Sequence, residues 1–223
     1  EALIDSGEMP DPFYGLNELK FGWFEEHVWE FKSIVFLTEE QLAKEYLELE
    51  LPSVDTYAKV YFNGKLILET ANAFIPHRAQ VKELAKHGMN EIQVYITPPV
   101  MYHEKTYDEM GYQLPAPNDV HKNAVAPLTR KPQYQFGWDW SLRLNTIGFN
   151  KVAQIHAYDN NRIINSTINT AGIGEDGAEM EMLVEFAVKK DDTLVWESNH
   201  FGKQEMVIEN GVGRRTSQLI NPL

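Results

Sequence analysis

The chain has 223 residues, of which 43% are hydrophobic, 24% charged and 12% aromatic, a composition typical of a folded globular protein. Its formal charge of -13 argues against nucleic-acid binding, and no apolar run approaches the roughly 18 residues that span a membrane. The absence of cysteine excludes disulfides, thiolate catalysis and thiolate metal sites.

Short stretches of alternating apolar and polar residues, separated by turn residues, run through most of the chain. Strands with one wet face show this pattern because successive side chains point to opposite sides. Between two such stretches lies Asn63-Gly64, the strongest short signal for a hairpin, since both turn residues need positive φ. The predicted strands are 29–36, 47–51, 56–62, 66–69, 92–96, 152–158, 180–188 and 205–208.

Helical periodicity is scarce by comparison. Residues 1–5 could end a helix before Gly7, 38–45 could form one by propensity alone, and 81–86 predicts a single turn. Residues 100–110 are the best remaining helix candidate. Many short strands with turns between them favour an all-β sandwich.

A domain boundary is expected near residues 159–161. Four of the five tryptophans precede it, and the part after it is lighter in aromatic residues. That second part, which contains a polar turn at 172–177, is expected to hold three or four strands. An immunoglobulin-like sandwich has about seven strands, so the second unit is expected to be incomplete.

The long stretch without strand pattern from Thr97 to Pro132 leads into Gly137-Trp138-Asp139-Trp140. Irregular loops of this length are uncommon in compact domains unless they serve a function. Aromatic rings stack on the C–H faces of a sugar and a carboxylate accepts its hydroxyl hydrogen bonds, so the motif suits carbohydrate recognition. On residue types alone, the alternative that both tryptophans plug a core while the aspartate caps a turn is the better supported of the two.

At this motif the chain resembles a known family. Residues 130–140, Arg-Lys-Pro-Gln-Tyr-Gln-Phe-Gly-Trp-Asp-Trp, resemble the N-terminal domain of β-mannosidases of glycoside hydrolase family 2. Residues 4–18, which begin Ile-Asp-Ser-Gly-Glu-Met-Pro-Asp-Pro-Phe-Tyr-Gly, are similar to that family's N-terminal motif. Asp55 to Gly64 is similar to a hairpin shared more widely among family 2 sugar-binding domains.

The resemblance implies a jelly-roll, galactose-binding-like sandwich at 1–159 and a partial immunoglobulin-like sandwich at 160–223. In this family the two catalytic glutamates come from a (β/α)8 barrel of about 250 residues, for which this chain has no room. The chain is therefore expected to be a fragment without its first jelly-roll strand, to contain no catalytic residue and to be inactive alone. The compartment stays open, with an extracytoplasmic one slightly favoured.

By resemblance, three residues belong to the subsite for the non-reducing mannose. The family's Trp-Asp pair corresponds to Trp138 and Asp139, and an upstream asparagine corresponds to Asn118. The chain departs from the family directly afterwards, because Trp140 is followed by Ser141-Leu142-Arg143 where the family reads Gly-Pro-Arg. This departure puts the local loop geometry, and with it the subsite preference, in doubt.

The implied function is the sugar-binding part of an exo-β-mannosidase that hydrolyses terminal β-D-mannose with retention. Its implied partners are a β-mannoside or related oligosaccharide and the missing barrel domain of the same protein. Alternatives are part of another family 2 exo-glycosidase such as a glucosaminidase, a non-catalytic carbohydrate-binding module, and a structural sandwich without a ligand. No cofactor is expected, and the seven histidines show no metal-binding spacing.

Three further motifs have structural interpretations. Asn90-Glu91 mimics the Asn-Glu pair of such barrels but is expected to be a solvated turn. Arg130-Lys131 is expected to form a salt link that positions the Trp-Asp-Trp segment. Trp23 and Trp29, with Phe31 in register, are expected in the sandwich core.

Overall fold

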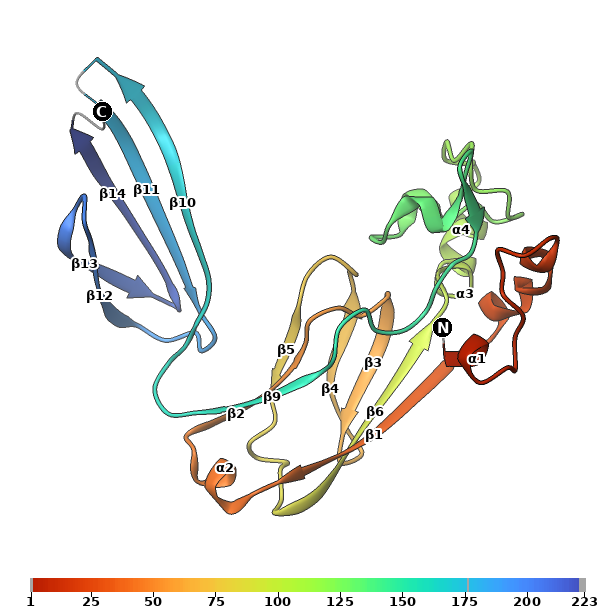
Figure 1. Cartoon of the computed structure of the whole chain (residues 1–223), viewed down its shortest axis with the longest axis horizontal. Helices are drawn as coiled ribbons and strands as arrows, with labels where there is room; N and C mark the ends of the chain where they lie inside the picture. The colour runs from red at the N-terminus through yellow and green to blue at the C-terminus, as the bar shows by residue number, and fades with distance from the viewer. Residues whose placement is uncertain (1, 176, 221–223) are drawn as a thin grey trace. The chain divides into compact units, whose positions relative to one another are not determined.

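The computed structural model describes residues 2–175 and 177–220, and the chain is mostly β, as the sequence predicts (Figure 1). It divides into two compact units, residues 1–157 and 158–223, and each is described by itself. Residues 1 and 223, where the predicted domains begin and end, lie outside the described residues. So does Asp176, which belongs to the predicted turn at 172–177.

The first unit contains two larger β-sheets. The four-stranded sheet has the order β1-β6-β3-β4, with antiparallel pairing throughout. The three-stranded sheet has the order β5-β2-β9. The strands of the two sheets are β1 (Trp29–Leu37), β2 (Tyr46–Leu51), β3 (Tyr57–Phe62), β4 (Lys65–Ala71), β5 (His77–Gln80), β6 (Gly88–Thr97) and β9 (Gln154–Tyr158).

One continuous apolar core joins the two sheets. Alternate side chains of β2, β3 and β6 are buried in it, as expected for strands with one covered face. Phe31 packs against this core, whereas Trp29 forms an aromatic cluster with Trp23 and Phe24. The main buried members are Leu47, Leu49, Leu51, Val54, Val60, Phe62, Ile92, Val94 and Ile96.

The predicted hairpin at Asn63-Gly64 is confirmed. It joins β3 to β4, and its two turn residues have φ values of 48° and 81°. The neighbouring prediction of a solvated turn at Asn90-Glu91 is wrong for Asn90, which is 1% exposed and lies within β6. Its amide accepts from the Lys86 N–H at 2.9 Å and donates to the Lys86 carbonyl at 2.7 Å. Asn90 is therefore a structural residue that fixes the entry into β6.

Short helices and two further strands fill the connections of the first unit. The capping box at Thr38 and Gln41 fixes the start of α2. The expected helix at 100–110 is present as two short pieces, α3 and α4. No helix among the described residues is long and apolar enough to cross a membrane. These elements are α1 (Ala2–Asp5), η1 (Asn17–Lys20), η2 (Gly22–Glu26), α2 (Glu39–Ala43), α3 (Pro99–Tyr102), α4 (Glu104–Met110), η3 (Ala126–Leu128), η4 (Gln133–Gln135), β7 (Phe136–Trp138) and β8 (Ser141–Arg143).

The second unit forms a single antiparallel sheet within its described residues, with the order β10-β11-β14-β13-β12. Its five strands make the expectation of three or four wrong. A small cluster of Val184, Phe186, Met206 and Ile208 is its buried apolar centre. The strands are β10 (Ile163–Gly174), β11 (Gly177–Phe186), β12 (Asp192–Ser198), β13 (Gly202–Glu209) and β14 (Val212–Ile220).

Candidate functional site

The Trp-Asp-Trp motif forms the tip of a small hairpin in the first unit. Trp138 ends β7 and pairs with Ser141 at the start of β8, which leaves Asp139 and Trp140 as the turn. The sequence pattern does not predict these strands because each has three residues, too few to show alternation. The turn places both tryptophans and the aspartate at the surface, so the core-plug alternative is wrong: Trp138 is 46% exposed and Trp140 69% exposed.

The hairpin borders a cavity of about 1060 Å³. Its other walls come from the segment around η1 and η2 and from the loop before His121. The three residues that the family resemblance assigns to the sugar subsite, Asn118, Trp138 and Asp139, all line it. The other lining residues include Phe13, Glu18, Leu19, Phe21, Phe24, Glu25, Val120, Tyr134, Trp140 and Arg143.

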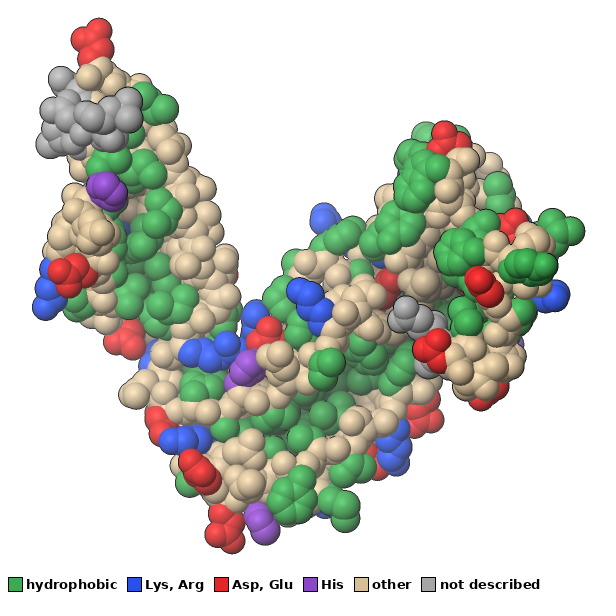
Figure 2. Space-filling view, viewed as in Figure 1, with side chains coloured by type: hydrophobic (Ala, Val, Ile, Leu, Met, Phe, Trp, Pro, Cys, Tyr) green, Lys and Arg blue, Asp and Glu red, His purple; other side chains and the backbone are tan. Residues whose placement is uncertain are grey.

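Exposed hydrophobic side chains surround this cavity. Figure 2 shows exposed hydrophobic side chains, in green, on the lobe that α1 and α4 mark in Figure 1. The Trp140 and Tyr134 rings lie 5.6 Å apart at an angle of 38°. Among the described residues, the side chains of Asn118 and Asp139 have no hydrogen-bond partner, so their polar groups are available to a ligand. Other exposed apolar residues of the lining are Phe13, Leu19 and Val120.

Gly137 allows the loop and the hairpin to touch. It has φ of +105° and is buried, and a Cβ atom there would lie 2.6 Å from the backbone oxygen of Asn118. Real Cβ contacts are never that short, so only glycine permits this approach. Because Gly137 has no side chain, Asn118 can lie beside the strand that carries Trp138.

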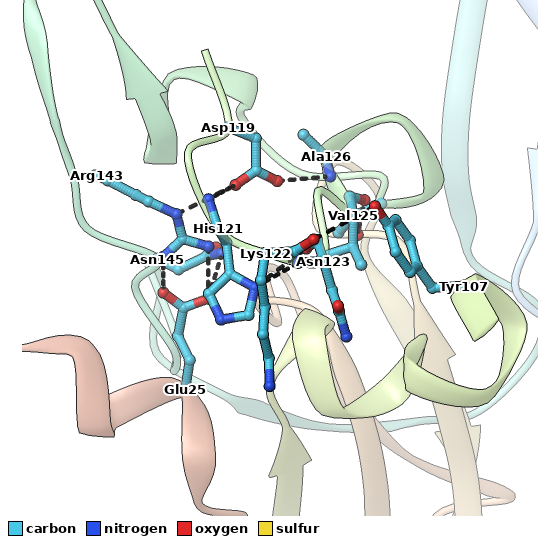
Figure 3. A network of polar contacts seen from close by, with 11 residues as sticks. Glu25, Tyr107, Asp119, His121, Lys122, Asn123, Val125, Ala126, Arg143 and Asn145 are labelled. Atoms are coloured by element: carbon cyan, nitrogen blue, oxygen red, sulfur yellow. Dashed lines mark hydrogen bonds and ion pairs between the residues drawn. The ribbon is translucent and has the colours of Figure 1, made fainter. Parts of the chain in front are cut away.

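Arg143 supports the same cavity through two carboxylates (Figure 3). Its terminal nitrogens donate to both oxygens of Glu25, with Nη2 to Oε2 at 3.0 Å, and its Nε donates to Asp119 Oδ1 at 3.2 Å. The side chains of Arg143, Glu25 and Asp119 are 16%, 7% and 1% exposed. Burial lowers the pKa of Arg143, but Glu25 and Asp119 outweigh it and hold that pKa above its ordinary value.

The expected salt link at Arg130-Lys131 is made by Lys131. Its Nζ lies 3.0 Å from Asp55 Oδ1 and donates to the Thr146 carbonyl at 2.8 Å, and the side chain is fully buried. Burial lowers the pKa of Lys131 despite the neighbouring Asp55 carboxylate. This pair anchors the chain just before β7, from which the hairpin projects.

The sequence did not identify the supporting residues Glu25 and Asp119. Asp119 directly follows the predicted Asn118, and Glu25 lies in the segment between two expected core tryptophans. A single acidic residue carries no signal of its partner, because the Glu25–Arg143 contact joins positions 118 residues apart. Only the tertiary structure brings these groups together.

The lining is suited to holding a sugar. Exposed indole rings offer faces for C–H groups, while a carboxylate and an amide offer hydrogen bonds to hydroxyl groups. The buried carboxylate of Glu25 is bound by Arg143 and Asn145 and is thus engaged in structure. The cavity therefore presents exposed polar and aromatic groups above a buried layer of paired charges.

Comparison with known proteins identifies the family of the chain. The model of the glycosyl hydrolase 2 galactose-binding domain-like family matches residues 1–151. A probable beta-mannosidase from Caenorhabditis elegans is 33% identical over 164 residues, which cover 70% of this chain and 18% of that protein. Beta-mannosidase B from Emericella nidulans is 28% identical over 234 residues, which cover 100% of this chain and 27% of that protein.

Solved structures include similar chains. The beta-D-mannosidase from Dictyoglomus thermophilum matches with a TM-score of 0.74 and 28% identity over 97% of this chain and 27% of its own. A beta-glucuronidase from Bifidobacterium dentium matches with a TM-score of 0.53 at 15% identity, over 86% of this chain and 33% of its own, and shares the fold. The chain thus spans about a fifth to a quarter of the length of the curated relatives that it matches.

Proposed function

The chain belongs to the family of glycosyl hydrolase 2 galactose-binding-like domains, and from that premise we propose that it is the N-terminal sugar-binding portion of an exo-β-mannosidase. The whole enzyme would hydrolyse terminal non-reducing β-D-mannose with retention. One observation carries the proposal: Asn118, Trp138 and Asp139, which lie in two separate segments, line the same cavity. Relatives in sequence and in structure that carry the name beta-mannosidase support this substrate over the alternatives.

Each of the three side chains has a role on this proposal. Asp139 accepts hydrogen bonds from hydroxyl groups of the mannose, Asn118 adds a further polar contact, and Trp138 forms part of the subsite wall. They act by positioning the sugar and by favouring its transition state, not by proton transfer. The acid/base and nucleophilic carboxylates would come from a barrel domain outside this chain.

The proposal also assigns the two units. The first, over about residues 1–159, is the sugar-binding jelly roll, and the second, over 160–223, is part of an immunoglobulin-like domain. The two-sheet core of the first unit supports the first assignment. The carbohydrate partner and the barrel as a partner within the same protein follow from this assignment.

The test is Asp139→Ala in the whole protein that contains this segment, assayed with 4-nitrophenyl β-D-mannoside and the matching β-D-glucosaminide. We expect the mannoside to be the better substrate and kcat/KM to fall at least about tenfold, or 1.4 kcal/mol, in the variant. Asp108→Ala, which removes an exposed carboxylate from α4, is the matched control. An unchanged kcat/KM in Asp139→Ala would remove this residue from the site, and preference for the glucosaminide would reject the mannosidase assignment.

A further inference from the structure

Arg143 connects three segments that form the cavity wall. Asp119 directly follows Asn118, Arg143 ends the strand whose Ser141 pairs with Trp138, and Glu25 lies in η2 beside the lining residue Phe24. The contacts join positions 118 and 24 residues apart in the sequence. Arg143 therefore ties the loop that carries Asn118 to the hairpin and to η2.

The charged groups of this network all have hydrogen-bond partners, whereas the buried Oδ1 of Asn145 has none among the described residues. One guanidinium faces two carboxylates, and the second negative charge is met by other donors. Asn145 Nδ2 donates to Glu25 Oε2 at 3.2 Å, and the backbone N–H groups of His121 and Ala126 donate to Asp119, each at 3.2 Å (Figure 3). A network whose buried charged groups are all paired favours one geometry of the segments that carry them.

Stability alone is a poor explanation for this arrangement. Burying an ion pair costs desolvation energy, and well-packed apolar side chains are often as stable in its place. The planar guanidinium fixes the directions of its hydrogen bonds. Its two terminal nitrogens donate to the Glu25 carboxylate, while Nε donates to that of Asp119. Lysine carries the same charge but lacks this fork, so it could not hold Glu25 and Asp119 in the same orientation.

We propose that Arg143 is a positioning residue: held by Glu25 and Asp119, it sets the position of Asn118 relative to the neighbouring Trp138–Asp139 pair in the cavity wall. The inference rests on the proposed function, in which these three side chains contact the sugar. Arg143 also lines the cavity, but Glu25 and Asp119 engage its guanidinium, so it acts through the contact groups.

The test uses the 223-residue chain labelled with 5-fluorotryptophan. Its five tryptophans are expected to give separate ¹⁹F resonances, which single Trp→Phe variants assign. Arg143→Lys is expected to shift the Trp138 resonance and to leave that of Trp196, in the second unit, unchanged. A merely structural role would lower the melting temperature without moving the Trp138 resonance of the folded protein.

Arg78→Lys is the matched control. Arg78 is also a partly buried arginine of the first unit that pairs with two carboxylates, Glu50 at 3.1 Å and Glu48 at 4.0 Å. It lies on β5, away from the cavity lining, so its replacement is expected to leave the Trp138 resonance unchanged. Should Arg143→Lys fail to fold, Glu25→Gln carries the same test, because it keeps the size of the side chain and removes its charge.

The activity of the whole protein separates the two proposals. If the unmodified protein hydrolyses β-mannosides, Arg143→Lys is expected to lower kcat/KM at least about tenfold. An unmoved Trp138 resonance in a folded Arg143 or Glu25 variant overturns the positioning role, whatever the activity. A shifted resonance in a protein without β-mannosidase activity rejects the proposed function and leaves the positioning of the cavity wall supported.

Discussion

Gly137 is the residue at which the hairpin of β7 and β8 touches the loop that carries Asn118. The contact is possible because glycine has no side chain. We predict that Gly137→Ala lowers the free energy of unfolding by about 2 kcal/mol or more. Two costs add, because φ of +105° is unfavourable for alanine and the new Cβ would lie 2.6 Å from the Asn118 oxygen. Urea unfolding followed by tryptophan fluorescence measures the loss.

Two other glycines separate these costs. Gly15 has φ of +62° with open space around it, so Gly15→Ala is expected to cost about 1 kcal/mol from backbone conformation alone. Gly22 also lines the cavity, lacks a positive φ and has open space, so Gly22→Ala is expected to change stability by less than about 0.5 kcal/mol. Equal losses in the Gly137 and Gly15 variants would show that the close approach is unimportant.

At the level of single residues, the sequence predicted the contact groups better than their supports. Trp138, Asp139 and Asn118 were identified from a local motif and its resemblance to a family, and all three line one cavity. Whether they bind sugar stays a prediction. The partners of Arg143 could not be predicted, because an ion pair depends on which distant segments meet in space.

Secondary-structure elements were predictable where local chemistry determines them. Asn63-Gly64 predicted its hairpin because positive φ at both positions is a property of the turn itself. Asn210-Gly211 carries the same signal and joins β13 to β14 with φ values of 47° and 75°, yet that hairpin was not predicted. Strand β10 (Ile163–Gly174) was missed because none of its residues is buried and their exposure shows no regular alternation.

The contact between α3 and β3 predicts a pH dependence of stability. The Tyr57 hydroxyl on β3 lies 2.5 Å from His103 Nε2 at the end of α3, and burial lowers the pKa of His103 below 6.5. Between that lowered value and 6.5 the unfolded chain holds more protons than the folded one. The contribution of His103 to the free energy of unfolding therefore falls as the pH drops below 6.5.

Denaturant unfolding of the unmodified chain and of His103→Gln, from about pH 7.5 down to about pH 5.5, measures this contribution. Glutamine can still hydrogen-bond to Tyr57 but does not titrate. The unmodified chain is expected to lose more stability over this range than the variant does. His87→Gln, at an exposed position, is the control, and parallel pH curves for the chain and His103→Gln would contradict the prediction.

On the scale of the whole molecule, the all-β class followed from the number of short alternating stretches. The number of strands after residue 158 did not, since five are present where three or four were expected. The small buried cluster there explains this difference. A sheet that buries only a few side chains imposes little hydrophobic periodicity on its sequence.

The open cavity predicts the affinity of the isolated chain for its sugar. On the proposed function, this chain supplies one wall of a subsite whose remaining walls belong to another domain. Trp138 and Trp140 are 46% and 69% exposed, which fits a wall that no second surface covers here. With few contacts to offset the loss of ligand freedom, we expect mannose to bind with a Kd of about 1 mM or weaker.

An NMR titration of the ¹⁵N-labelled chain with mannose, to about 50 mM, measures this affinity. Saturable shifts are expected for cavity residues and not for the second unit, and Asp139→Ala is expected to abolish them while Asp108→Ala does not. A Kd below about 0.1 mM would contradict the incomplete-wall interpretation and favour a self-sufficient carbohydrate-binding module. Shifts that persist in Asp139→Ala would mean that the cavity holds the sugar without its carboxylate, and the role proposed for Asp139 would then fail.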